Sequence, residues 1–144
     1  MPALTTLLKP TGRLRTVLRL LLALAVAAHV YGLYTPGEPN AVEWFPNADK
    51  VFHFIGFAVP SCLAVLLTRH WWPLVVFATN AAVSELVQYR WLPHRDGDWF
   101  DLLTDLTGLL PALGLYVWLQ ATSSSTADSS PITRTSAASR RPKA

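Results

Sequence analysis

The sequence predicts an all-α membrane protein, a four-helix transmembrane bundle with both termini in the cytoplasm. Hydrophobic residues make up 51% of the 144 residues, and the mean hydropathy is +0.30 although both ends of the chain are polar. The apolar residues therefore gather in one transmembrane domain over 17–120, in four runs close to the roughly 20 residues that a membrane helix needs. Basic residues flank these runs, which is typical of a multi-pass protein of the cell membrane.

The first half of the chain holds two of the predicted spans. A basic leader covers residues 1–16, and the nearly uninterrupted apolar run that follows it predicts a span over 17–34. Three prolines and a net negative charge mark residues 35–50 as a loop. The second span covers 51–68, where Pro60 near the middle predicts a kink.

The second half holds the other two spans. A tight turn at 69–70 leads into a span over 73–89, which has a proline in its first turn, a favourable position for that residue. A polar loop over 90–98 precedes the last span, 99–120. The tail, 121–144, is rich in Ser, Thr, Ala and Pro, a composition that predicts disorder.

The charges of the loops predict the orientation of the bundle. The leader, the turn at Arg69 and the tail are basic, whereas the loop over 35–50 is acidic. By the positive-inside rule, both termini and the turn face the cytoplasm, and the two longer loops face outside. A rival interpretation makes the first apolar run a cleaved signal peptide, with small residues at Ala25, Ala27 and Ala28 near the cleavage site.

Composition also excludes several classes of function. The net charge of +3 and the pI near 9.4 could indicate nucleic acid, but the basic residues flank apolar spans rather than form a binding face. We therefore expect no nucleic-acid partner. The single cysteine, Cys62, allows no internal disulfide, and no C-x-x-C motif is present. We expect no cofactor.

Ionisable residues near one end of the predicted bundle are the candidates for function. A charge inside a membrane helix costs roughly 2.5–3.5 kcal/mol, so such residues are usually paired and often functional. Residues three, four or seven apart share a helix face, and at about 1.5 Å per residue Glu85 and Asp105 lie at similar depths in their spans. We expect one ligand-binding cluster at the outer face, made of Asp49, Lys50, His53, Glu85, Gln88, Arg95, Asp98, Asp101 and Asp105.

Three further interpretations of this cluster stay open. The residues could serve only as polar contacts between helices, worth about 0.6 kcal/mol each. They could be catalytic, with His53 as general acid or base and Glu85 or Asp101 as its partner. One histidine with several carboxylates also suits a divalent cation, but no compact ligand motif is present, and we expect no metal. Overall we lean against an enzyme.

At these residues the sequence resembles the VanZ-like family of small bacterial membrane proteins. The matching text is DKVFHFIGF from Asp49, ELVQ from Glu85 and PHRDGDWFDLLTDLTG from Pro93. The family pattern has Asp-Lys-x-x-His, then Glu-x-x-Gln, then Arg, Asp-x-x-Asp, Asn and Gly. The chain departs from it at Asp105, where the family usually has Asn, and this adds a carboxylate in place of a neutral amide.

The resemblance implies a protein of the cell envelope with a retained first span. The founding member of the family is associated with resistance to the glycopeptide teicoplanin. Our leading hypothesis is that the cluster binds an outer-leaflet lipid or a lipid-linked cell-wall intermediate, with Lys50, Arg90 and Arg95 meeting phosphate. The alternative is an intramembrane enzyme that acts on the same kind of lipid-linked substrate.

Overall fold

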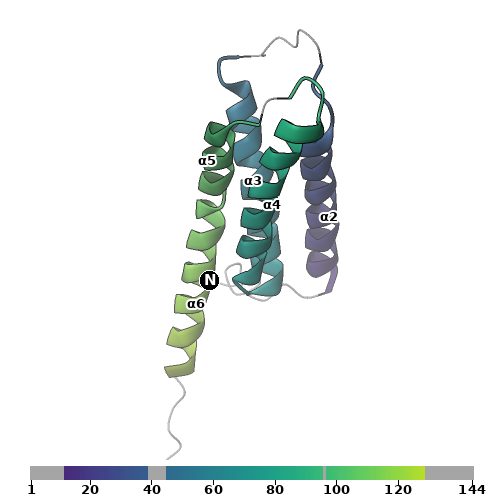
Figure 1. The fold of residues 1–144 in the computed structure, drawn as a ribbon. Coiled ribbons are helices and arrows are strands. Elements are labelled where there is room, and N and C mark those ends of the chain that lie inside the picture. Colours follow the sequence, from purple (N-terminus) through teal and green to yellow (C-terminus); the bar gives the residue numbers. More distant parts are fainter. Residues whose placement is uncertain (1–11, 39–44, 96, 129–144) are drawn as a thin grey trace, which may run out of the picture.

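The molecule is a bundle of helices. The computed structural model describes residues 12–38, 45–95 and 97–128, and every regular element within these ranges is a helix. Helices α5 and α6 continue one another as a single rod beside the other three (Figure 1). The helices are α2 (Gly12–Tyr34), α3 (Ala48–Thr68), α4 (Trp72–Trp91), α5 (Trp99–Gly108) and α6 (Leu110–Asp128).

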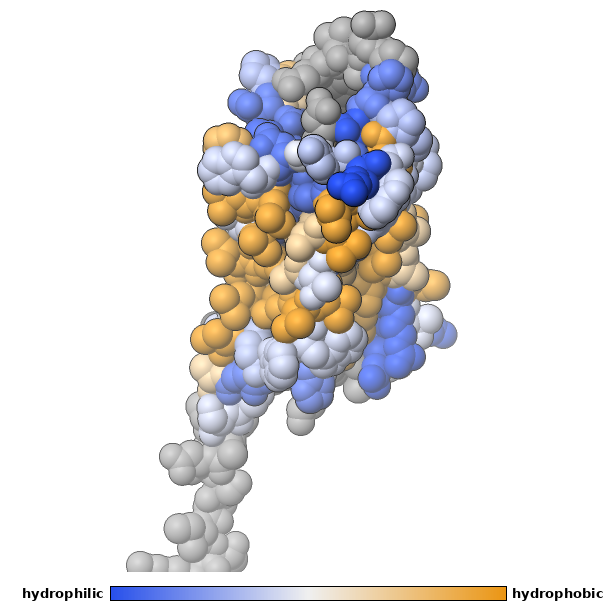
Figure 2. Space-filling model, in the orientation of Figure 1, coloured by the Kyte–Doolittle hydropathy of each residue, from blue (hydrophilic) through white to orange (hydrophobic). Residues whose placement is uncertain are grey.

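By length and composition, three helical segments are able to cross a membrane. They are α2, α3 and the α5–α6 rod from Trp99 to Ser124. Figure 2 shows the corresponding apolar band across the middle of one face, between hydrophilic residues at both ends. Helix α4 is of similar length, but Asn80, Glu85 and Gln88 make it more polar, and it is not among the three. The predicted third span therefore exists as a helix, and its passage through a membrane is not confirmed.

The helices run alternately up and down. The α3–α4 turn at Arg69 lies at the end of the bundle opposite the other two connections (Figure 1). Those two connections touch, because the backbone N–H of Gly37 donates to the carbonyl of Pro93 at 3.0 Å. The residues predicted to form the polar cluster lie at the end of the bundle where these connections meet.

Helix α3 is the centre of the packing and contacts α2, α4, α5 and α6. Gly108 allows α5 to approach closely, since a Cβ on it would lie 2.7 Å from the carbonyl oxygen of Phe54 and 3.1 Å from Cβ of Phe57. Gly114, in contrast, faces open space. The buried apolar residues around this contact are Leu33, Phe57, Ala64, Phe77, Ala81 and Leu109.

The two internal prolines act differently. Helix α3 continues through Pro60 without a break, although a proline cannot donate to the carbonyl four residues before it. That carbonyl belongs to Gly56, and the buried His29 of α2 lies beside Gly56, with its Nδ1 3.5 Å from where a Cβ would be. Near Pro111 the rod is interrupted instead, with a turn at Leu109 between α5 and α6, because the proline ring clashes with the preceding helical turn.

Both outer helices are longer than predicted. Helix α2 begins at Gly12 rather than at residue 17, and α6 continues to Asp128, so the tail expected from residue 121 starts as helix. Hydroxyl groups there bond the carbonyls of the preceding turn, as Ser123 does with Leu119 at 2.8 Å, which satisfies them within the helix. The rest of the predicted leader and tail lies outside the described residues.

Candidate functional site

Three of the predicted residues meet in the interior of the bundle. His53 comes from α3, Glu85 from α4 and Asp105 from α5. One nitrogen or oxygen atom of each lies within 4.8 Å of the others, and the side chains are 8%, 8% and 0% exposed. We call these three residues the buried cluster. His53 Nδ1 donates to Asp105 Oδ1 at 2.8 Å.

The connection before α5 is hydrogen-bonded to the buried cluster. Glu85 Oε2 accepts a hydrogen bond from the backbone N–H of Asp98 at 2.9 Å. Asp98 in turn caps α5, since its side chain accepts from the N–H of Phe100. Gly97 lies against α4 so closely that a Cβ would come within 2.4 Å of the Glu85 carbonyl oxygen. Glu85 therefore holds the start of α5 in place.

Two oxygens of the buried cluster lack a partner among the described residues. These atoms are Glu85 Oε1 and Asp105 Oδ2, and both are inaccessible to solvent. Leaving a buried polar atom without a hydrogen bond costs about 1–3 kcal/mol, and more for a charged group. These two oxygens can therefore bind a further group in addition to the described side chains.

Lys50 lies in a separate ion-pair group. Its ammonium contacts Asp101 at 2.8 Å and Asp49 at 3.1 Å. These three side chains are more exposed than the buried cluster, at 33% for Lys50, 44% for Asp49 and 11% for Asp101. Because two carboxylates already neutralise Lys50, it is less suited to phosphate than the sequence indicated.

Gln88 and Arg95 bond the backbone at the end of α2. The buried Gln88 donates to the carbonyl of Leu33 at 3.1 Å, and Arg95 donates to that of Gly32 at 2.8 Å. Both bonds satisfy carbonyls in the last turn of a helix, which have no partner within the helix itself. Arg90, which we expected beside Arg95, is exposed in the last turn of α4.

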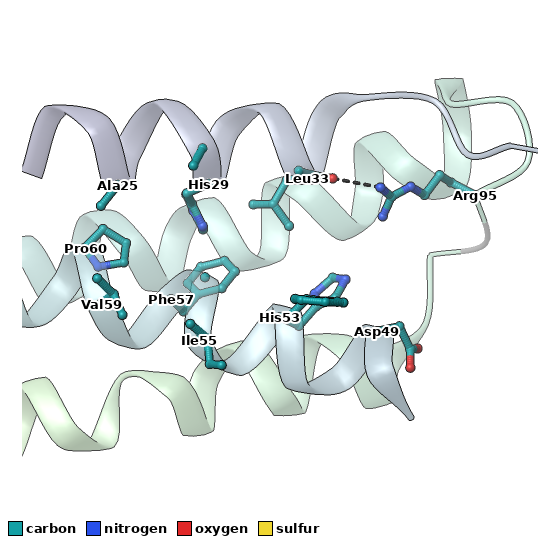
Figure 3. Close-up of a pocket in the computed structure, with 14 residues that line it drawn as sticks. Ala25, His29, Leu33, Asp49, His53, Ile55, Phe57, Val59, Pro60 and Arg95 are labelled. Carbon is teal, nitrogen blue, oxygen red and sulfur yellow. Dashed lines mark hydrogen bonds between the residues drawn. The ribbon is translucent and has the colours of Figure 1, made fainter. Parts of the chain in front are cut away.

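A groove of about 580 Å³ runs between α2 and α3. Its walls are mostly apolar, and Figure 3 shows Asp49, His53 and Arg95 toward one end and Ala25, Val59 and Pro60 toward the other. A second hollow continues along the same two helices and shares Ala25, Ala28 and Val59 with the first. We call the two hollows together the α2–α3 groove.

The groove includes residues that the sequence interpretation had not assigned to a site. Ala25, Ala28 and Gly32 line it from α2. Their spacing of three and four residues places small side chains on one face of that helix, and this signal was visible in the sequence. Gly56 of α3 faces them, but nothing in the sequence indicated that these two faces are neighbours.

A partly buried polar chain adjoins the groove. Tyr34 donates to Asn80 Oδ1 at 2.9 Å, and Asn80 Nδ2 lies 3.1 Å from His29 Nε2. His29 also packs edge-on against Phe57, with 4.5 Å between ring centroids. His29 is therefore a buried core residue that joins α2 to α3 and α4.

Comparisons with known proteins give no relative for this chain: no family model matches it, and neither does any curated protein or solved structure.

Proposed function

We propose that the protein binds a phosphate-bearing lipid of the outer leaflet in the α2–α3 groove. The observation that carries the proposal is the form of the groove, which is apolar along most of its length and has Asp49, His53 and Arg95 at one end. A lipid has the same polarity, with one charged end and an apolar tail. The hollow at the polar end of the groove has a volume of about 580 Å³, which is within the usual range of roughly 300–1,000 Å³ for ligand pockets.

The length of the groove supports a lipid tail. Its lining on α3 runs from Asp49 to Leu63, which at about 1.5 Å per residue is roughly 20 Å. One leaflet contributes about half of the roughly 30 Å hydrocarbon core of a membrane. Several lining side chains, such as Phe52, Ile55 and Val59, are about half exposed on the apolar surface, so a tail could enter sideways.

Arg95 is the residue that we expect to hold the head group. Arg95 is half-buried. Its hydrogen bond to the carbonyl of Gly32 uses one of the five guanidinium N–H donors. The remaining donors suit bidentate contact with phosphate. The resemblance to the VanZ-like family extends the proposal to a lipid-linked cell-wall intermediate as the source of that phosphate, and through it to glycopeptide resistance.

The test compares two substitutions on neighbouring residues of α2. Ala28→Phe fills the groove, whereas Ala27 is exposed on the same helix and does not line it, so Ala27→Phe is the control. Each protein is purified in native-lipid particles and its co-purified lipids are identified by mass spectrometry. We expect an envelope lipid enriched in wild type and in Ala27→Phe, and reduced at least about tenfold, or 1.4 kcal/mol, in Ala28→Phe.

The head-group part is tested with Arg95→Gln in the same experiment. Loss of the enriched phospholipid without loss of helicity supports phosphate binding by Arg95. Bulk lipid of identical composition in wild type and all variants contradicts the proposal and leaves Arg95 as a purely structural residue that bonds the end of α2.

A second candidate, an intramembrane enzyme, has one observation in its favour. His53 lines the groove and is hydrogen-bonded to Asp105, the arrangement of a histidine that is oriented for general acid–base catalysis. If the protein is an enzyme, wild type must release a head-group product from the bound lipid, and His53→Asn must not. Binding without any product favours the carrier or accessory role.

A further inference from the structure

We propose that the buried cluster binds a divalent transition-metal cation, with His53, Glu85 and Asp105 as its protein ligands. The inference does not depend on lipid binding. It begins from the geometry, since one nitrogen or oxygen atom from each of three helices lies within 4.8 Å of the others. All three side chains are at least nine-tenths buried.

The unpartnered oxygens are the independent observation that points to a ligand. Glu85 Oε1 and Asp105 Oδ2 have no hydrogen-bond partner among the described residues. Each belongs to a carboxylate whose other oxygen is already bonded, to the Asp98 N–H and to His53 respectively. A cation between these carboxylates would satisfy both free oxygens at once.

The charges around the cluster favour a divalent ion. Neutral His53 with ionised Glu85 and Asp105 carries a charge of −2, which one divalent cation balances. Among the described contacts, neither Lys50 nor Arg95 bonds the cluster: Lys50 pairs with Asp49 and Asp101, and Arg95 donates to the carbonyl of Gly32. Buried charges are stable in proteins when they are paired or coordinate a metal.

The donor atoms favour a transition metal over calcium. Ca²⁺ prefers shells made only of oxygen, whereas Mn²⁺ and Zn²⁺ accept imidazole together with carboxylate. His53 Nδ1 and Asp105 Oδ1 are 2.8 Å apart and share a proton. Coordination through these two atoms would release that proton, and two adjacent ligands of an octahedral ion with bonds of about 2.1 Å lie about 3 Å apart. No compact sequence motif marks this site, because each ligand comes from a different helix.

The experiment uses Mn²⁺, which has its own paramagnetic signal. Wild type without a histidine tag is treated with EDTA, dialysed against Mn²⁺ and analysed for bound metal. We expect one ion per chain, and affinity weakened at least about tenfold in Glu85→Gln and in Asp105→Asn. Glu38→Gln is the control, because it removes an exposed carboxylate that lines neither the buried cluster nor the groove, and it should bind as wild type does.

Two results of the binding measurement would overturn the proposal. One is that wild type binds no Mn²⁺; the other is that all variants bind equally, which indicates an adventitious surface ion only. A spectroscopic measurement on wild type keeps the test decisive should a variant fail to fold. Pulsed paramagnetic resonance of bound Mn²⁺ must show coupling to a histidine nitrogen, and its absence would also refute the site.

Discussion

At the scale of the residue, position 105 shows how one atom changes the chemistry of a site. Asp105 is fully buried, and its carboxylate faces His53 with one oxygen while the other lacks a partner among the described residues. An asparagine there would accept the same bond from His53 and would carry two N–H donors in place of the free oxygen. The carboxylate therefore lowers the stability of the metal-free bundle and gives the cluster its capacity for a cation.

This predicts opposite effects of two substitutions on stability in the presence of a chelator. Asp105→Asn should raise the free energy of unfolding by about 1 kcal/mol, because a donor replaces an unsatisfied buried acceptor. Asp105→Leu should lower it by about 1–3 kcal/mol, because His53 loses its acceptor. Thermal unfolding in detergent with EDTA measures both. A lower melting temperature for Asp105→Asn than for wild type would contradict this account of the buried oxygen.

At the scale of the helix, close approach and not hydrophobicity decides where α5 lies. Lipid is as apolar as leucine, so packing between membrane helices depends on small residues and interhelical hydrogen bonds. Gly108 supplies the first of these at its contact with α3. The hydrogen bond between His53 and Asp105 supplies the second about one turn away along α5.

The glycines of the α5–α6 rod offer a matched pair for testing this packing. Gly108→Ala places a methyl group 2.7 Å from the Phe54 carbonyl, and because backbone must move, we expect a loss of about 1–3 kcal/mol in unfolding free energy. Gly114→Ala meets nothing within 4 Å and should gain about 0.5–1 kcal/mol from helix propensity. Equal effects of the two substitutions on thermal unfolding in detergent would rule out close packing at Gly108.

The spacing of residues along each helix predicted which of them share a face of that helix. It did not predict which faces of different helices contact each other. Glu85 and Gln88 are both buried on α4, and Asp101 and Asp105 both on α5, as their separations of three and four residues indicated. The groove could not be predicted, because it depends on how α2 is rotated against α3. The pairing of Lys50 with Asp101 likewise depends on contact between two helices, about which the spacing within either one carries no information.

At the scale of the whole molecule, α4 decides between three and four membrane crossings. It lies between the turn at Arg69 and the connection at Pro93, which are at opposite ends of the bundle. Its mean hydropathy is lower than that of the three apolar segments, but its polar residues Ser84, Glu85 and Gln88 are buried inside the bundle. Since these polar groups face protein, the remaining surface of α4 is apolar enough to meet lipid, with Val75, Val76, Val83 and Leu86 exposed.

We therefore predict that the ends of α4 lie on opposite sides of the membrane. Cys62 is the only cysteine of the chain, so Cys62→Ala provides a background for single cysteines at the exposed positions Pro46, His70 and His94. A membrane-impermeant thiol reagent added to intact cells should label Pro46→Cys and His94→Cys and spare His70→Cys, because the positive-inside rule places the basic turn in the cytoplasm. Labelling after lysis controls for reactivity at each position. If His94→Cys reacts from the same side as His70→Cys, α4 does not cross the membrane. The buried cluster, which includes Glu85 of α4, would then not be enclosed by four membrane-spanning helices.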